Sequence, residues 1–209
     1  MRILITGAAG MVGRKLIARL AKDGTLNGRK ITALDLHDIV PPQAPAMEGV
    51  SISTHTGDLA EAGAAESLVA SRPDVIFHLA GIVSGEAEAN FDLGYRVNLD
   101  GTRALFDAIR LAGFAPRVVF TSSIAVFGAP FPEKIGDEFF TTPLTSYGTQ
   151  KAIGELLLSD YSRRQFFDGA RFDYCGYRLP TQNHCRSLTI SLFGSLINGP
   201  RHCKGSAQG

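Results

Sequence analysis

Short apolar runs alternate along the chain with segments in which apolar residues recur every three or four positions. The runs are rich in β-branched residues and have the length of strands buried on both faces of a sheet. They occupy residues 2–6, 30–35, 50–55, 74–79 and 117–121. The spacing of three and four is typical of helices with one apolar face. It covers residues 13–22, 62–70, 98–112 and 147–165.

Regular alternation of strands and helices predicts an α/β fold. Right-handed crossovers between parallel strands place helices on both faces of the sheet, which gives a doubly wound parallel sheet of the Rossmann type. We expect one domain over residues 1–168, because no linker divides this part. Residues 169–209 form an atypical C-terminal segment. A last strand in residues 171–180 followed by an irregular tail, and an irregular subdomain, are both compatible with this segment.

The bulk composition excludes several classes of protein. With 209 residues, 44% hydrophobic and 20% charged, the chain can bury a single core. A net charge of +1 without any basic run gives no attraction to nucleic acid or to an anionic membrane surface. A membrane span would need about 18 consecutive apolar residues, which the sequence lacks. We expect a cytoplasmic protein that acts on a small molecule.

The cysteines make a metal site or a disulfide framework improbable. All three lie late in the chain, at Cys175, Cys185 and Cys203, and an odd number without a C-x-x-C spacing does not fit a disulfide scaffold. Two His-Cys pairs, at residues 184–185 and 202–203, supply four candidate ligands. Adjacent ligands point apart, however, and the spacing matches no common zinc site. We therefore expect no metal.

Residues 6–13, Thr-Gly-Ala-Ala-Gly-Met-Val-Gly, join the first strand to the first helix through three spaced glycines. In a dinucleotide-binding turn, such glycines permit the tight turn, the approach of backbone to a pyrophosphate, and the packing of helix on sheet. The N–H groups at the helix N-terminus then bind the anion. An ordinary glycine turn is the alternative. We expect cofactor contacts at Gly7, Ala9, Gly10, Met11, Val12 and Gly13.

An acidic residue further along the chain indicates which dinucleotide binds. Asp35 ends the second predicted strand, about 20 residues after the glycines, where a carboxylate can accept hydrogen bonds from the adenosine ribose. A carboxylate would repel the 2′-phosphate of NADP, and no arginine follows closely. The sequence thus predicts NAD, unless Asp35 is only a solvated loop acid.

Two later strand ends add candidate cofactor contacts. Residues 57–59 follow the third strand, and we expect Asp58 and Leu59 to face the adenine. Residues 78–81 end the fourth strand with Leu79, Ala80 and Gly81, which leave room for a cofactor. The preceding histidine, His78, has apolar neighbours and is more typical of a packed core residue than of a catalyst.

Tyr147 and Lys151 lie four residues apart, and hence on one face of a helix. Ser123 follows the fifth strand, so it projects from the same carboxyl edge of the sheet. These three residues suit hydride transfer from a secondary alcohol: Ser123 would bind the substrate oxygen, and Tyr147 would take its proton. Lys151 and the positive nicotinamide would favour the phenolate. A surface helix beside a strand-end turn is the alternative.

The whole set of motifs resembles the extended short-chain dehydrogenase/reductase family. The matching segments are TGAAGMVG at 6–13, Asp35, GDL at 57–59, HLAG at 78–81, NLDGT at 98–102, TSSIAVFG at 121–128 and YGTQK at 147–151. The resemblance implies that Ser123, Tyr147 and Lys151 are catalytic and that Asn98 supports the lysine. It also implies that Asn98, Tyr147 and Lys151 contact the cofactor.

Longer segments of the chain resemble NAD-dependent members of this family that oxidise a four-carbon sugar acid at C2. The loop 82–86, with Ser84, would then line the substrate site together with Ser123 and Tyr147. A nucleotide-sugar epimerase or dehydratase remains an alternative, since those enzymes share the serine, tyrosine and lysine. Relatives often dimerise through two long helices per subunit, so the helices 98–112 and 147–165 predict a homodimer. Packing of their apolar faces on the sheet alone is the alternative.

Three departures from the family pattern limit this interpretation. Phe127 stands where many relatives have tyrosine, an expected Arg-Pro-Gly segment after residues 176–181 is missing, and the part that supplies the substrate lid in relatives is absent. The clustered cysteines after residue 168 suggest a truncated or frame-shifted end. An NAD-binding module without turnover is therefore a further alternative.

Overall fold

The structure is a computed structural model that describes residues 1–130, 135 and 139–174. The chain divides after Tyr174, and the fold below is that of the first unit, Met1–Tyr174. The tail, the two His-Cys pairs and the position of the missing Arg-Pro-Gly segment lie outside the described residues. Part of the last predicted strand is present, because β8 (Asp168–Tyr174) reaches into it.

Six parallel strands form one sheet in the order β5-β4-β1-β6-β7-β8. The chain starts in the middle with β1, crosses to β4 and β5 on one side, and then returns to β6, β7 and β8 on the other. The doubly wound α/β prediction is confirmed. The strands other than β8 are β1 (Arg2–Thr6), β4 (Ala33–Asp38), β5 (Ser51–Thr56), β6 (Val75–His78) and β7 (Arg117–Ser123).

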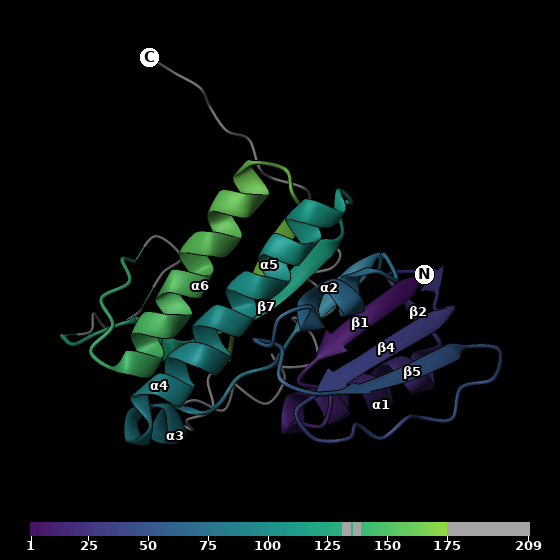
Figure 1. Cartoon of the computed structure of the whole chain (residues 1–209), viewed down its shortest axis with the longest axis horizontal. Coiled ribbons are helices and arrows are strands. Elements are labelled where there is room, and N and C mark those ends of the chain that lie inside the picture. Colours follow the sequence, from purple (N-terminus) through teal and green to yellow (C-terminus); the bar gives the residue numbers. More distant parts are fainter. Residues whose placement is uncertain (131–134, 136–138, 175–209) are drawn as a thin grey trace, which may run out of the picture. The chain divides into compact units, whose positions relative to one another are not determined.

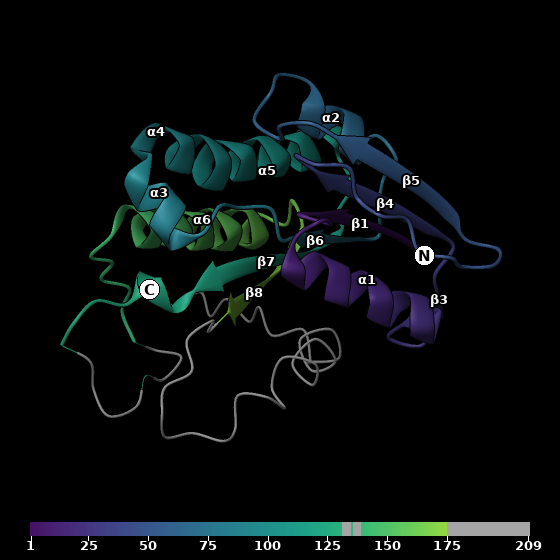
Figure 2. The ribbon, with the colours of Figure 1, turned by 90° about the horizontal axis from the view of Figure 1, so that it is seen from below.

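Helices cover both faces of this sheet (Figure 2). One face carries α1 (Met11–Asp23), and the other carries α2 (Ala64–Val69), α5 (Gly101–Ala112) and α6 (Ser146–Arg163). Helices α5 and α6 run side by side (Figure 1). The core beneath them is aromatic: the rings of Phe106 and Phe120 meet edge to face at 6.3 Å, and Phe167 tilts against Phe106 at 5.0 Å.

Two local features differ from the sequence prediction. The strand expected at residues 30–35 begins at Ala33 and continues to Asp38, because residues before it form a hairpin of β2 (Thr25–Leu26) and β3 (Arg29–Lys30). Asn27 and Gly28 both adopt positive φ, of 50° and 72°, which is the requirement of a two-residue hairpin turn.

The helix predicted to start at residue 98 is preceded by shorter turns of helix. These are α3 (Ser84–Ala89), α4 (Phe91–Gly94) and a π-helix over Tyr95–Asp100 that runs directly into α5. A π-helical turn widens the helix and often marks a functional site. Among the helices of the described residues, none is both long and apolar enough to cross a membrane.

Candidate active site at the carboxyl edge of the sheet

The glycine-rich turn between β1 and α1 is packed so tightly that side chains cannot enter it. Gly7 has φ +74°, and a Cβ there would lie 2.5 Å from the carbonyl carbon of Leu79. A Cβ on Gly13 would lie 2.2 Å from the carbonyl oxygen of Gly7. Both positions therefore require glycine. Gly10 is exposed, so backbone there is open to a ligand.

The first turn of α1 is free to bind an anion. Gly10 is the N-cap of α1, and no described side chain caps the helix. The N–H groups of Met11 and Val12 are among those that a helix leaves without an internal acceptor. The turn itself is held against β4, because Ala8 N–H donates to the His37 carbonyl at 3.0 Å and Ala9 N–H donates to Asp38 Oδ2 at 2.8 Å. These residues fit a dinucleotide pyrophosphate.

The prediction that Asp35 ends the second strand is wrong. Asp35 lies in the middle of β4, opposite Leu4, and is 3% exposed. Its carboxylate pairs with Arg2 at 3.2 Å and accepts a hydrogen bond from Ser71 at 2.9 Å. The strand continues for three more residues, so Asp38 is the acid at its carboxyl end. The pairing of Thr6 with His37 puts Asp38, and not Asp35, next to the glycine turn.

Asp58 and Leu59 follow β5, as the sequence indicated. Asp58 accepts a hydrogen bond from Ala60 N–H at 2.8 Å and pairs with Arg96 at 2.7 Å. Leu59 is buried in the core. In the protein alone, therefore, Asp58 closes the turn after β5 and fixes it to the π-helix. The contact of both residues with adenine stays a prediction.

Leu79, Ala80 and Gly81 connect the glycine turn to the side chains of Asn98 and Lys151. The backbone of Leu79 and Ala80 packs on Gly7. A Cβ on Gly81 would lie 2.8 Å from Asn98 Oδ1 and 3.3 Å from Lys151 Nζ. Gly81 itself is exposed, so the segment passes directly over the lysine with one side open. Ser84 is exposed at the first position of α3.

The structure brings together Ser123, Tyr147 and Lys151. Ser123 ends β7, close enough for its hydroxyl to influence the pKa of the Tyr147 phenol. Lys151 is 4% exposed, and its Nζ donates to the Thr121 carbonyl at 3.1 Å and stands 5.8 Å from the centre of the Tyr147 ring. The start of α6 is fixed by Thr145, whose Oγ1 accepts from Gly148 N–H at 3.0 Å.

Burial dominates the electrostatics of this trio. It lowers the pKa of Lys151 to about 8, because an ammonium ion loses hydration inside the protein. Burial also raises the pKa of Tyr147, while the Ser123 hydroxyl acts in the opposite direction. In the protein alone, desolvation thus disfavours the phenolate, and its stabilisation by Lys151 together with the nicotinamide stays a prediction.

His78 is a structural residue in this arrangement. It is fully buried, with Nδ1 2.7 Å from Thr6 Oγ1 and Nε2 2.9 Å from Thr102 Oγ1. Burial is the main reason why the pKa of His78 falls to about 3. The imidazole is therefore neutral, and it ties the end of β1 to the start of α5.

Asn98 lies on the π-helix and is fully buried. Its side-chain amide forms hydrogen bonds with the backbone of Ile82 and with the side chain of Gln150. The sequence alone did not indicate a role for Gln150. Gln150 lies between Tyr147 and Lys151 within the recognised motif, but its importance depends on contacts across the fold. The catalytic and cofactor-binding roles of Asn98 stay predictions.

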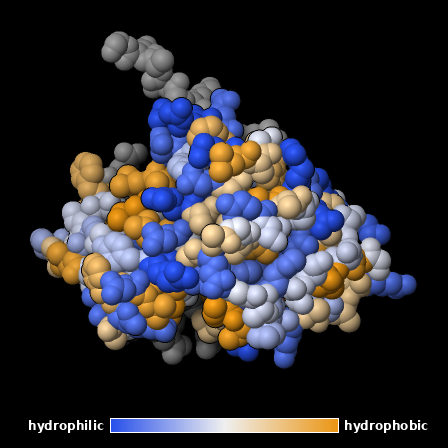
Figure 3. All heavy atoms as spheres, in the orientation of Figure 1, coloured by the Kyte–Doolittle hydropathy of each residue, from blue (hydrophilic) through white to orange (hydrophobic). Residues whose placement is uncertain are grey.

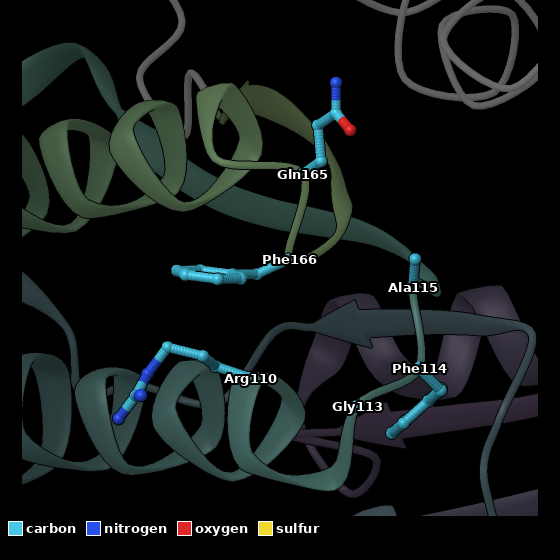
Figure 4. Close-up of a pocket in the computed structure, with 6 residues that line it drawn as sticks. All are labelled: Arg110, Gly113, Phe114, Ala115, Gln165 and Phe166. Carbon is cyan, nitrogen blue, oxygen red and sulfur yellow. The ribbon is translucent and has the colours of Figure 1, made fainter.

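A separate cavity of about 250 Å³ lies away from these residues. It is formed between the α5–β7 and α6–β8 connections, at the opposite edge of the sheet (Figure 4). Arg110 stands 6.0 Å from the centre of the Phe166 ring there. Within residues 1–130, 135 and 139–174, no three His, Cys, Asp or Glu side chains gather as metal ligands would.

A Gly-rich β1–α1 turn and a Ser-Tyr-Lys set at one sheet edge define a nucleotide-dependent short-chain dehydrogenase/reductase class. Residues 3–182 match the model of the NAD dependent epimerase/dehydratase family, and the chain belongs to that family. The extended short-chain dehydrogenase/reductase resemblance is confirmed.

Two relatives carry the same name. D-erythronate dehydrogenase of Cupriavidus necator is 47% identical over 185 residues, which cover 87% of this chain and 55% of that protein. The enzyme of that name from Haemophilus influenzae is 39% identical over 206 residues, covering 97% and 62%. This chain thus spans between about half and two thirds of the length of these relatives.

Solved structures agree with the fold. A nucleoside-diphosphate-sugar epimerase from Agrobacterium tumefaciens is 61% identical with a TM-score of 0.82, covering 90% of this chain and 56% of that one. The UDP-glucose 4-epimerase of Brucella ovis, solved in complex with NAD, is 27% identical with a TM-score of 0.68, covering 83% and 51%.

Proposed function

We propose that this chain carries the NAD-binding and catalytic part of a dehydrogenase that oxidises a secondary hydroxyl of a sugar acid such as D-erythronate. The observation that carries the proposal is the meeting of Ser123, Tyr147 and Lys151 beside an uncapped, glycine-lined helix N-terminus. The relatives named D-erythronate dehydrogenase supply the substrate class.

The glycine turn and the start of α1 would hold the pyrophosphate of NAD. Asp38 takes over the role first assigned to Asp35, because its carboxylate stands at the end of β4 beside Ala9. A carboxylate there accepts hydrogen bonds from ribose hydroxyls and repels a 2′-phosphate. When bound, NAD⁺ supplies a hydride acceptor and a positive charge next to Tyr147.

Three side chains would remove the proton of the substrate hydroxyl: those of Ser123, Tyr147 and Lys151. Ser123 would donate a hydrogen bond to the substrate oxygen, and the Tyr147 phenolate oxygen would accept the proton of the substrate hydroxyl. Lys151 keeps a positive charge at neutral pH, since its pKa is about 8. This charge, together with that of the cofactor, opposes the desolvation that raises the pKa of Tyr147.

Assay of the full chain with NAD⁺ and D-erythronate tests the proposal. We expect NADH to accumulate, detected by its absorbance, and to disappear in Tyr147→Phe. Failure of a panel of four- to six-carbon hydroxy acids with a folded, NAD⁺-binding chain would reject the dehydrogenase. Binding without turnover on any substrate class would support the NAD-binding module instead.

Sugar-nucleotide epimerisation is the second candidate, because the family includes UDP-glucose 4-epimerases, one of them 29% identical to this chain over 212 residues. The two activities differ in the fate of the hydride. An epimerase returns it to the substrate, so NADH does not accumulate and the configuration of the sugar changes. Incubation with UDP-glucose followed by analysis of the sugar therefore separates them.

We further propose that a second copy of the chain packs on α5 and α6. Apolar side chains stand between polar ones over these helices (Figure 3). Leu111 and Leu156 are each 68% exposed, which is unusual for leucine on two neighbouring helices. Light scattering should give a dimer mass for the full chain and a monomer mass for Leu156→Lys. A monomer before substitution would reject this arrangement.

A further inference from the structure

Gln150 is a fully buried polar residue inside the Tyr147–Lys151 motif. Its Oε1 accepts a hydrogen bond from Asn98 Nδ2 at 2.8 Å. Its Nε2 has no hydrogen-bond partner among the described residues. That nitrogen faces Gly94, where a Cβ would lie only 2.7 Å away. The fold therefore makes room for this amide at the junction between α4 and the π-helix.

The amide of Asn98 connects Gln150 to the backbone of Ile82. Asn98 Oδ1 accepts from Ile82 N–H at 3.0 Å, and Asn98 Nδ2 also donates to the Ile82 carbonyl at 3.4 Å. The adjacent Gly81 lies against both Asn98 Oδ1 and Lys151 Nζ. Position 82 is thus fixed where the chain passes over the catalytic lysine and enters the loop that precedes α3.

An asparagine amide alone does not fix its own orientation, since its oxygen and nitrogen ends have nearly the same shape. The backbone N–H of Ile82 sets the orientation, because it can only donate and therefore faces the Asn98 oxygen. The Asn98 nitrogen then points to Oε1 of Gln150, the nearer of its two acceptors. Without that acceptor, the Asn98 nitrogen would be buried with only the longer bond to the Ile82 carbonyl.

We propose that Gln150 is a positioning residue that acts through Asn98. It would hold the Gly81–Ile82 backbone over Lys151, at the start of the segment that leads to α3. The inference rests on the proposed function where it concerns substrate. Gln150 would affect the binding and turnover of the sugar acid. Its effect on NAD⁺ binding would be smaller than its effect on substrate, because the glycine turn and α1, which would hold the pyrophosphate, are not part of this set of contacts.

Hydrogen exchange tests the contact without needing activity. In Gln150→Leu, which keeps the approximate size but lacks the acceptor, the Ile82 amide should exchange about tenfold faster, as expected for the loss of one buried hydrogen bond. Gln150→Glu keeps an acceptor oxygen and should retain most of the protection. Gln43→Leu makes the same change at an exposed loop position and serves as the control. Unchanged exchange at Ile82 in Gln150→Leu would overturn the proposal.

Kinetics on the same variants test the consequence for substrate. In Gln150→Leu, we expect KM for the sugar acid to rise about tenfold and kcat to fall, while most of the thermal shift by NAD⁺ remains. Both kinetic constants should recover in Gln150→Glu. A fall in rate at constant KM, together with a lower melting temperature, would indicate a merely structural role and refute the inference. A wild-type chain without turnover rejects the proposed function, and exchange at Ile82 then decides on the Gln150 contact by itself.

Discussion

The two halves of the carboxyl edge are built by different means. On the β4 side, the site consists mainly of backbone, with glycines at positions where no side chain fits and N–H groups at the start of α1. The carboxylate of Asp38 stands beside this backbone. On the β7 side, it consists of buried polar side chains held by hydrogen bonds: Asn98 bonds Gln150, and Lys151 bonds the Thr121 carbonyl. The first half depends on shape, and the second depends on hydrogen bonds in a desolvated interior.

Removal of the Tyr147 hydroxyl should have the largest effect on turnover, and it should show whether the two halves of the site act independently. Tyr147→Phe keeps the ring but loses the proton acceptor, so turnover should fall by about 10²–10⁴-fold. Thermal shift by NAD⁺ should remain. If the shift disappeared with the activity, the two halves would not be independent in the way that the contacts suggest.

A methyl group in the glycine turn should instead abolish the binding of NAD⁺. In Gly13→Ala, the new Cβ would lie 2.2 Å from the Gly7 carbonyl oxygen, so the turn must distort, at about 1–3 kcal/mol or more. We expect a lower free energy of unfolding in denaturant titration and loss of the NAD⁺ thermal shift. Gly85→Ala, at a position with open space around it, is the matched control.

Lys151 should be essential for turnover and unfavourable for stability. Its pKa is about 8 in the fold against 10.5 in the unfolded chain. Between these values the unfolded chain binds more protons, so wild-type stability should rise with pH.

Lys151→Met removes the buried charge, so it should raise the free energy of unfolding at neutral pH by on the order of 2 kcal/mol. This gain should shrink from pH 8 to 10.5. Urea titrations at a series of pH values measure it. A variant that is less stable at neutral pH would show that the bond to Thr121 outweighs desolvation.

The smallest expected effect is a change in NAD⁺ affinity, which should distinguish Asp38 from Asp35 on β4. Asp38→Asn should weaken NAD⁺ binding about tenfold, through loss of a charged hydrogen-bond acceptor. Asp35→Asn should leave NAD⁺ affinity unchanged and lower stability, since Asp35 pairs with Arg2 and Ser71. Calorimetric titration with NAD⁺ provides the measurement. The opposite result would restore Asp35 as the ribose ligand.

The sequence predicted the parts of the fold that local patterns encode. Alternating strands and helices gave the parallel sheet, and the spacing of Gly7, Gly10 and Gly13 gave the cofactor turn. The same patterns did not show where β4 ends, because the hairpin turn at Asn27 and Gly28 shifted the strand by three residues. Asp35 was therefore assigned a position that Asp38 occupies.

By itself, the sequence determined the fold class, the family, and the identity of Ser123, Tyr147 and Lys151 as the candidate trio. Those conclusions follow from residue spacing along single elements. The tertiary structure alone decided which acid faces the glycine turn, that burial raises the pKa of Tyr147, and that Gln150 holds Asn98. These depend on strand register, desolvation and contacts between residues far apart in the chain, and a linear pattern contains none of the three.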